Sequence, residues 1–96
     1  MESLKISIRD LKKEDISERK LPKNTTGVVV TEISEGSPLM FVSVNDVILE
    51  LQKKKVTNSR QFSNLAKETI NKGATTLYLA IFNSSNQRSY ITVKLK

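Results

Sequence analysis

The chain has 96 residues, a formal net charge of +6, and neither Cys nor His. Its length fits one domain, and its 38% hydrophobic and 27% charged residues are typical of a folded globular protein. The missing residue types exclude disulfides, thiol nucleophiles, the Ser-His-Asp triad and Cys- or His-based metal sites, so we do not expect an independent enzyme.

The charges are unevenly distributed along the chain. Residues 28–52 contain no base, whereas residues 53–96 contain nine bases and one acid. Such asymmetry can mark a surface for nucleic acid or anionic lipid, and a steep loss of binding with added salt would identify one. The bases after Lys55 are scattered singly along the chain, so no nucleic-acid partner is expected. The acids lack metal-loop spacing, and we expect no metal and no cofactor.

The first half of the chain predicts two strands and two short helical segments. Strict alternation over residues 4–9 predicts a half-buried strand, and the β-branched run 28–33 predicts a second one. The charged segment 12–20 predicts one or two helical turns. Ser37, followed by Pro38, predicts the cap of another short helix.

One long helix is predicted from Asn58 or Ser59 to near Gly73. Asn58 with Gln61 three residues later has a capping-box pattern, and Gly73 fits the left-handed position after the last turn. At 100° per residue, this helix carries two adjacent stripes. The stripe expected in the core is Phe62, Leu65 and Thr69. The second stripe is smaller and more polar, and leaves room beside the helix: Ser59, Ser63, Ala66 and Ile70.

Three further strands are predicted at residues 46–51, 76–82 and 90–95, with a hairpin turn at 52–55. The fold class is therefore α+β: a curled antiparallel sheet, or partly open barrel, of five or six strands capped by one long and one or two short helices. The longest apolar run, 77–82, is far too short to span a membrane. The first residues lack the layout of a secretory signal.

Three motifs in sequence carry a family resemblance. They are residues 27–38, which end in Gly-Ser-Pro, residues 45–50, which contain Asp-Val-Ile, and residues 56–58, which open the helix. In this order they resemble the PDZ domains of HtrA/Deg (DegP-like) serine proteases, often the second such domain. The resemblance covers residues 4–95. It implies that residues 1–96 form a single PDZ domain of the circularly permuted bacterial type, with residues 1–3 as linker or the remnant of a trimmed end.

The resemblance also implies a binding site. In this family a carboxyl-terminal peptide adds as a strand beside the first strand, which is β-augmentation, and the long helix forms the other wall of the groove. The peptide carboxylate sits in a nest of backbone N–H groups just before that strand, here at residues 3–6. The implied peptide-binding residues are Leu4, Lys5, Ile6, Ser7, Ile8 and Arg9 on the loop and strand, with Ser59, Ser63, Ala66 and Ile70 on the helix.

Two replacements depart from the family pattern. Lys5 stands where the family usually has Gly in the carboxylate loop, and Lys rarely adopts a positive φ. We expect either a distorted nest or an ammonium group that pairs directly with the carboxylate, while an exposed strand residue without ligand contact is a third reading. Gln52-Lys53 replaces the usual Asn-Gly of the tight hairpin, which costs on the order of 1 kcal/mol if Lys53 is left-handed.

The expected function is that of a non-catalytic, regulatory PDZ module of an exported HtrA/Deg serine protease, a hydrolase of protein quality control. It would capture carboxyl-terminal or extended hydrophobic segments of misfolded proteins in the periplasm, beside the protease domain and other PDZ domains of its parent. The alternative is a degenerate PDZ domain that serves protomer assembly or interdomain contacts of the protease oligomer.

Overall fold

The computed structural model describes residues 4–39 and 41–95, so the expected linker residues 1–3 lie outside the described part. The described part contains six strands and two helices. In chain order they are β1 (Ile6–Asp10), α1 (Lys13–Arg19), β2 (Val28–Ile33), β3 (Val47–Leu51), β4 (Lys54–Lys55), α2 (Ser59–Asn71), β5 (Thr76–Phe82) and β6 (Arg88–Lys94).

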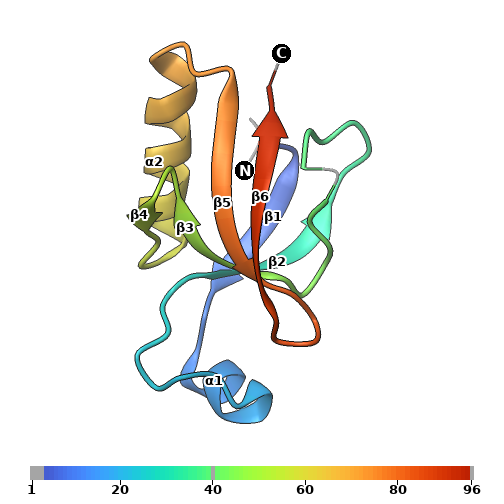
Figure 1. Ribbon diagram of the computed structural model, residues 1–96, viewed down its shortest axis with the longest axis vertical. Coiled ribbons are helices and arrows are strands. Elements are labelled where there is room, and N and C mark those ends of the chain that lie inside the picture. The colour runs from blue at the N-terminus through green and yellow to red at the C-terminus, as the bar shows by residue number, and fades with distance from the viewer. Residues whose placement is uncertain (1–3, 40, 96) are drawn as a thin grey trace.

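All strands belong to one antiparallel sheet in the order β1-β2-β3-β5-β6, and the short β4 pairs with β3. β1 and β6 are the two ends of this order, so the sheet is open. In the described part of the chain, no strand pairs with the outer edge of β1. The predicted α+β fold with an open antiparallel sheet and one long helix is confirmed (Figure 1).

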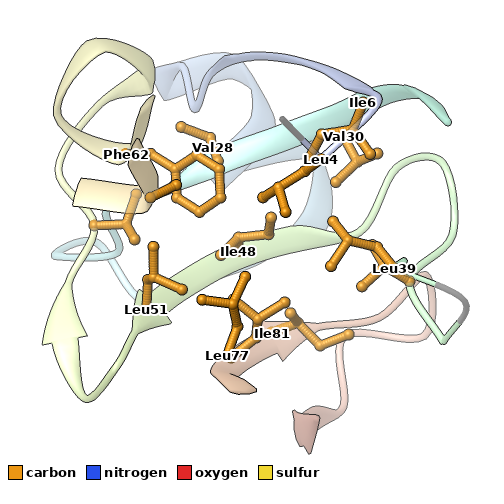
Figure 2. Close-up of a cluster of buried hydrophobic side chains, with 14 of the residues drawn as sticks. Leu4, Ile6, Val28, Val30, Leu39, Ile48, Leu51, Phe62, Leu77 and Ile81 are labelled. Carbon is orange, nitrogen blue, oxygen red and sulfur yellow. The ribbon is translucent and has the colours of Figure 1, made fainter. Parts of the chain in front are cut away.

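The main core lies between the sheet and α2 (Figure 2). Side chains alternate along β2, so Val28 and Val30 point into this core while Val29 joins a smaller cluster on the opposite face of the sheet. Phe62 on α2 is fully buried, as predicted for the core stripe. Burial of such a side chain is worth about 1.5–3 kcal/mol, so this contact fixes which face of α2 meets the sheet.

Both ends of α2 follow the predicted signals. The Asn58 side chain accepts a hydrogen bond of 2.8 Å from the Gln61 backbone N–H. The Gln61 carboxamide oxygen accepts from the Thr57 backbone N–H, at 3.1 Å, instead of closing a capping box on Asn58. Gly73 follows the helix at φ 87°, the left-handed conformation that Gly adopts at low energetic cost.

The short helix expected after Ser37 is absent from the described residues around it, and that prediction is wrong. The Ser37 hydroxyl donates a 2.6 Å hydrogen bond to the Leu4 carbonyl oxygen and accepts one of 3.2 Å from the Leu39 N–H. Its hydroxyl therefore joins this turn to the start of β1 rather than capping a helix.

The predicted helical turns at 12–20 form α1, which has no buried residue and lies at one end of the long axis of the molecule (Figure 1). Polar contacts attach it to the rest of the domain. The Arg19 guanidinium donates to the carbonyl oxygens of Asn45, at 2.6 Å, and Asn83, at 2.8 Å. α1 is therefore a peripheral element that depends on ionic and hydrogen-bonded contacts.

Candidate functional site

β1 and α2 enclose an open hollow of about 360 Å³. One wall is the outer edge of β1, the end strand of the sheet, and the other is the small-residue stripe of α2. The hollow is lined by Ser7, Ile8, Ser59, Arg60 and Ser63. The structure thus brings together residues from both predicted walls, and adds Arg60, which the sequence analysis did not select. We call this the β1–α2 groove.

The predicted site residues occupy three levels of burial. Leu4, Ile6 and Ala66 belong to the main core, with at most 3% of each exposed. Their side chains are therefore part of the packed interior and not of a free contact surface. The half-buried members are Ile8, Arg9, Ser59, Ser63 and Ile70, and the exposed ones are Lys5 and Ser7.

The loop that precedes β1 passes through a left-handed residue. Lys5 lies at φ 53°, a conformation that Gly adopts at a lower energetic cost than Lys. Two hydrogen bonds fix the loop to the turn at residues 34–37: the Ser37 hydroxyl donates to the Leu4 carbonyl at 2.6 Å, and the Ser34 N–H donates to the Lys5 carbonyl at 2.8 Å. Both carbonyls are therefore held on the side of that turn.

The Lys5 side chain lies over the same turn. Its ammonium nitrogen is 3.3 Å from the position that a Cβ on Gly36 would occupy. A side chain at residue 36 would crowd this amine, in addition to the strain of the φ of 85° at Gly36. The local sequence does not identify Ser34, Gly36 and Ser37 as supports of the loop, although the Gly-Ser-Pro motif predicts their turn.

The other end of the groove is closed by Asp10. Its Oδ1 accepts a 2.7 Å hydrogen bond from the backbone N–H of Ser59, the first residue of α2. This bond holds the pKa of Asp10 below its ordinary value. The contact ties the end of β1 to the start of α2, so the two walls of the groove are joined at this end.

Arg9 is directed away from the groove. Its two terminal nitrogens donate to the two carboxylate oxygens of Asp15 on α1, at 2.7 and 2.8 Å. Hydrogen bonding to this guanidinium lowers the pKa of Asp15 to about 2. The Arg9 side chain therefore attaches α1 to β1.

A second hollow, of about 540 Å³, lies at the opposite edge of the sheet. Its lining includes Phe41 and Tyr90, which are 75% and 74% exposed. We call this the Phe41–Tyr90 surface. No group of His, Cys, Asp or Glu that could hold a metal ion lies within the described residues, and no helix among them is long and apolar enough to cross a membrane.

No protein-family model matches the sequence, and no curated protein matches it either. Solved structures do match. The HtrA3 PDZ domain bound to a phage-derived ligand (FGRWV) is 19% identical, with a TM-score of 0.69 over 95% of this chain and 81% of that one. The PDZ domain of EpsC from Vibrio cholerae is 13% identical, with a TM-score of 0.60 over 98% of both chains.

The HtrA-type protease AlgW with a decapeptide also matches, with 19% identity and a TM-score of 0.65 over 95% of this chain. The chain spans 27% of the AlgW chain, so it corresponds to one part of that protease. At these sequence identities the structural likeness shows the fold alone. The strand order of this chain and the position of α2 agree with a PDZ-like fold. The chain has the fold of a PDZ domain.

Proposed function

We propose that this chain is a non-catalytic module that binds carboxyl-terminal peptide segments by β-augmentation in the β1–α2 groove. The observation that carries the proposal is the outer edge of β1, which faces α2 across an open hollow and starts from a left-handed loop at Lys5. The peptide-bound state of the HtrA3 PDZ domain and of AlgW supports the same use of the fold.

In this proposal the peptide runs antiparallel to β1, with its carboxylate at loop 4–6. Main-chain hydrogen bonds to β1 supply affinity, each with a net worth of about 0.5–1.5 kcal/mol. In this arrangement the last side chain of the peptide would lie near the half-buried Ile70, which packs against the main core. β-augmentation requires a peptide whose backbone N–H and C=O groups are free to pair with β1. We therefore expect an unfolded or extended segment to bind.

The parent protein we infer is an exported HtrA/Deg serine protease of the periplasm. The motif resemblance over residues 27–58 and the structural likeness to HtrA-type domains support this inference. The chain itself contains no His and no Cys, so hydrolysis belongs to a separate protease domain. That domain and other PDZ domains of the parent are the inferred partners within the same protein, and misfolded proteins with exposed hydrophobic termini are the inferred substrates.

Peptide binding can be tested with paired variants on the two faces of α2. Ser63 is half-buried and lines the groove, whereas its neighbour Asn64 is exposed and does not line it. Ser63→Trp should fill the groove and weaken a free-acid peptide at least tenfold, and Asn64→Trp should leave the affinity unchanged. The proposal fails if the two variants bind alike, or if amidation of the peptide leaves its affinity intact.

Protomer or interdomain contact is the second candidate function, and the Phe41–Tyr90 surface favours it. Exposed aromatic side chains that line one hollow are typical of contact surfaces between proteins. Sedimentation velocity of the chain and of Tyr90→Ser tests this candidate. Self-association that the substitution abolishes would support it, and a monomer at high concentration would contradict a contact between copies.

A further inference from the structure

We propose that the hollow of the Phe41–Tyr90 surface binds an arginine side chain that a partner protein presents. This inference rests on the second candidate function, a contact between proteins, and adds the chemistry of the partner to it. The hollow lies at the opposite edge of the sheet from the β1–α2 groove, so the inference does not depend on peptide binding in that groove.

The hollow contains one charged group, and that group is an acid. Among the described residues that line the hollow, Asp46 is the only charged one, and the others have hydroxyl, carboxamide, aromatic or aliphatic side chains. The whole chain carries a formal net charge of +6. A carboxylate in a hollow without bases attracts a cation locally, whereas most of this basic surface repels one.

The Asp46 carboxylate is held in place and has one oxygen without a partner. The residue is only 3% exposed. Its Oδ2 accepts a 2.8 Å hydrogen bond from the Ser43 backbone N–H, whereas its Oδ1 accepts none from residues 4–39 and 41–95. Within those residues, the fully buried side-chain oxygen without a partner is Thr26 Oγ1, so Asp46 Oδ1 is accessible to solvent. A largely buried carboxylate gains free energy from a cationic donor.

Two cations of this chain lie near the hollow, and both have other partners. The Arg19 guanidinium donates to the carbonyl oxygen of Asn83 at 2.8 Å and to a second loop carbonyl at 2.6 Å. Arg88 lies 3.2 Å from a carboxylate oxygen of Glu50. Neither arginine forms an ion pair with Asp46. A cation from outside would therefore meet an unpaired carboxylate.

The aromatic rings of this surface suit a guanidinium. Phe41 and Tyr90 carry the two most exposed large hydrophobic side chains among the described residues. The Arg88 guanidinium carbon lies 5.4 Å from the centre of the Tyr90 ring, so this ring already contacts one such group. A guanidinium is planar, stacks on aromatic rings and has five N–H donors, whereas a lysine ammonium is compact and strongly hydrated. Arginine is therefore the best match to a carboxylate beside exposed rings.

The test uses three acetylated and amidated peptides, Gly-Ser-Xaa-Ser-Gly, whose central residue is Arg, Lys or citrulline. Citrulline is neutral and has nearly the shape of Arg, and amidation removes the free carboxylate that the β1–α2 groove would bind. We expect backbone amide NMR titrations to shift residues 43–46 and 83–91. The Arg peptide should bind about fivefold more tightly than the citrulline peptide, with the Lys peptide between them. Equal affinities for Arg and citrulline, or shifts confined to other residues, would overturn the inference.

Substitutions then assign binding to the carboxylate and to a ring. Asp46→Asn keeps an oxygen for the Ser43 N–H and should abolish the preference for Arg over citrulline. Phe41→Ser alters an exposed side chain and should weaken the Arg peptide about threefold, which keeps the inference testable if Asp46→Asn does not fold. The control is Tyr78→Ser, which is 51% exposed and outside the hollow. Equal binding by Phe41→Ser, Tyr78→Ser and the natural chain would contradict the inference.

The same experiments separate this inference from a contact between copies of the chain. A chain that remains monomeric and binds the Arg peptide through the hollow supports the inference, and its partner is then a different protein. Self-association without any preference for Arg over citrulline supports a contact of another chemistry and overturns the inference.

Discussion

Lys5 holds a backbone conformation that costs a residue with a side chain about 1–2 kcal/mol relative to Gly. The surrounding hydrogen bonds from Ser34 and Ser37 keep it there, because each fixes a carbonyl of the loop. Local strain of this kind tends to concentrate at ligand sites. The Lys therefore retains the loop shape that the proposed carboxylate site requires.

Substitutions at Lys5 should separate its backbone role from its charge. Lys5→Gly relieves the strain and should raise the free energy of unfolding by about 1 kcal/mol while peptide binding persists. Lys5→Val, whose β-branched side chain strongly disfavours a positive φ, should abolish binding of the free-acid peptide. Urea unfolding and peptide titration measure both effects. Peptide binding by Lys5→Val as tight as that of the natural chain would contradict the account of the loop.

The β3–β4 hairpin contains two further residues in the left-handed conformation. Gln52 and Lys53 lie at φ 53° and 64°, as expected for a two-residue turn that usually contains Gly. The Gln52 side chain bridges to β5, where it accepts from the Tyr78 N–H at 2.7 Å and donates to the Thr76 carbonyl at 3.1 Å. This bridge gives Gln52 a structural role that Lys53 lacks.

We predict that Lys53→Gly raises the free energy of unfolding by about 0.5–1 kcal/mol, because the relief of strain exceeds the added chain entropy. The matched control is Lys54→Gly in β4, which should lower the free energy of unfolding by a similar amount, because Gly weakens a strand. Thermal or urea unfolding distinguishes them. Destabilisation by both substitutions would show that Lys53 is not strained.

At the scale of elements, α1 differs from the rest of the domain because charge attaches it. The Arg9–Asp15 pair is bidentate, and Asp15 also accepts from the Lys12 N–H at 2.8 Å, which satisfies the start of α1. The Asp15 side chain is 15% exposed and that of Arg9 40% exposed, so the pair is only partly shielded from water. The contribution of this ion pair to the free energy of unfolding should therefore be modest and should depend on pH.

The sign of that dependence follows from Asp15. Its pKa falls from 3.8 to about 2 on folding, so the stabilisation is complete above about pH 4 and disappears as the pH falls toward 2. Asp15→Asn should lower the free energy of unfolding at pH 7 by about 1 kcal/mol, after allowance for solvent screening, and flatten its pH dependence between 4 and 2. Glu14→Gln, an exposed neighbour, is the control. Identical pH profiles for Asp15→Asn and the natural chain would contradict this account.

The elements themselves were largely predictable because each has a local signal. Alternation marked β1, β-branched residues marked β2, and Asn58 and Gly73 marked the ends of α2. The wrong element was the short helix after Ser37. The Ser37 hydroxyl does accept a hydrogen bond from a nearby backbone N–H, that of Leu39, but it also donates to the Leu4 carbonyl, 33 positions earlier. The sequence around Ser37 does not predict a contact with such a distant residue.

At the scale of the whole molecule, the fold could be predicted, while the contacts that join β1 to α2 could not. Of the predicted site residues, Ser7, Ile8, Ser59 and Ser63 line the hollow. The small-residue stripe of α2 followed from helical spacing, and the edge strand followed from the family resemblance. The bond between Asp10 and Ser59 joins residues 49 positions apart, and Phe41 lies in a loop without periodicity. The Asp10–Ser59 hydrogen bond and the surroundings of Phe41 both depend on contacts between distant segments of the folded chain, so the sequence alone does not predict them.

The measurement that most directly tests peptide capture is a titration of backbone amide NMR signals with peptides that end in apolar residues, each as free acid and as amide. We predict that the free acids alone shift the amides of residues 4–9 and 59–70. Silence at millimolar peptide, equal shifts with both forms, or shifts confined to the Phe41–Tyr90 surface would contradict the account of the β1–α2 groove.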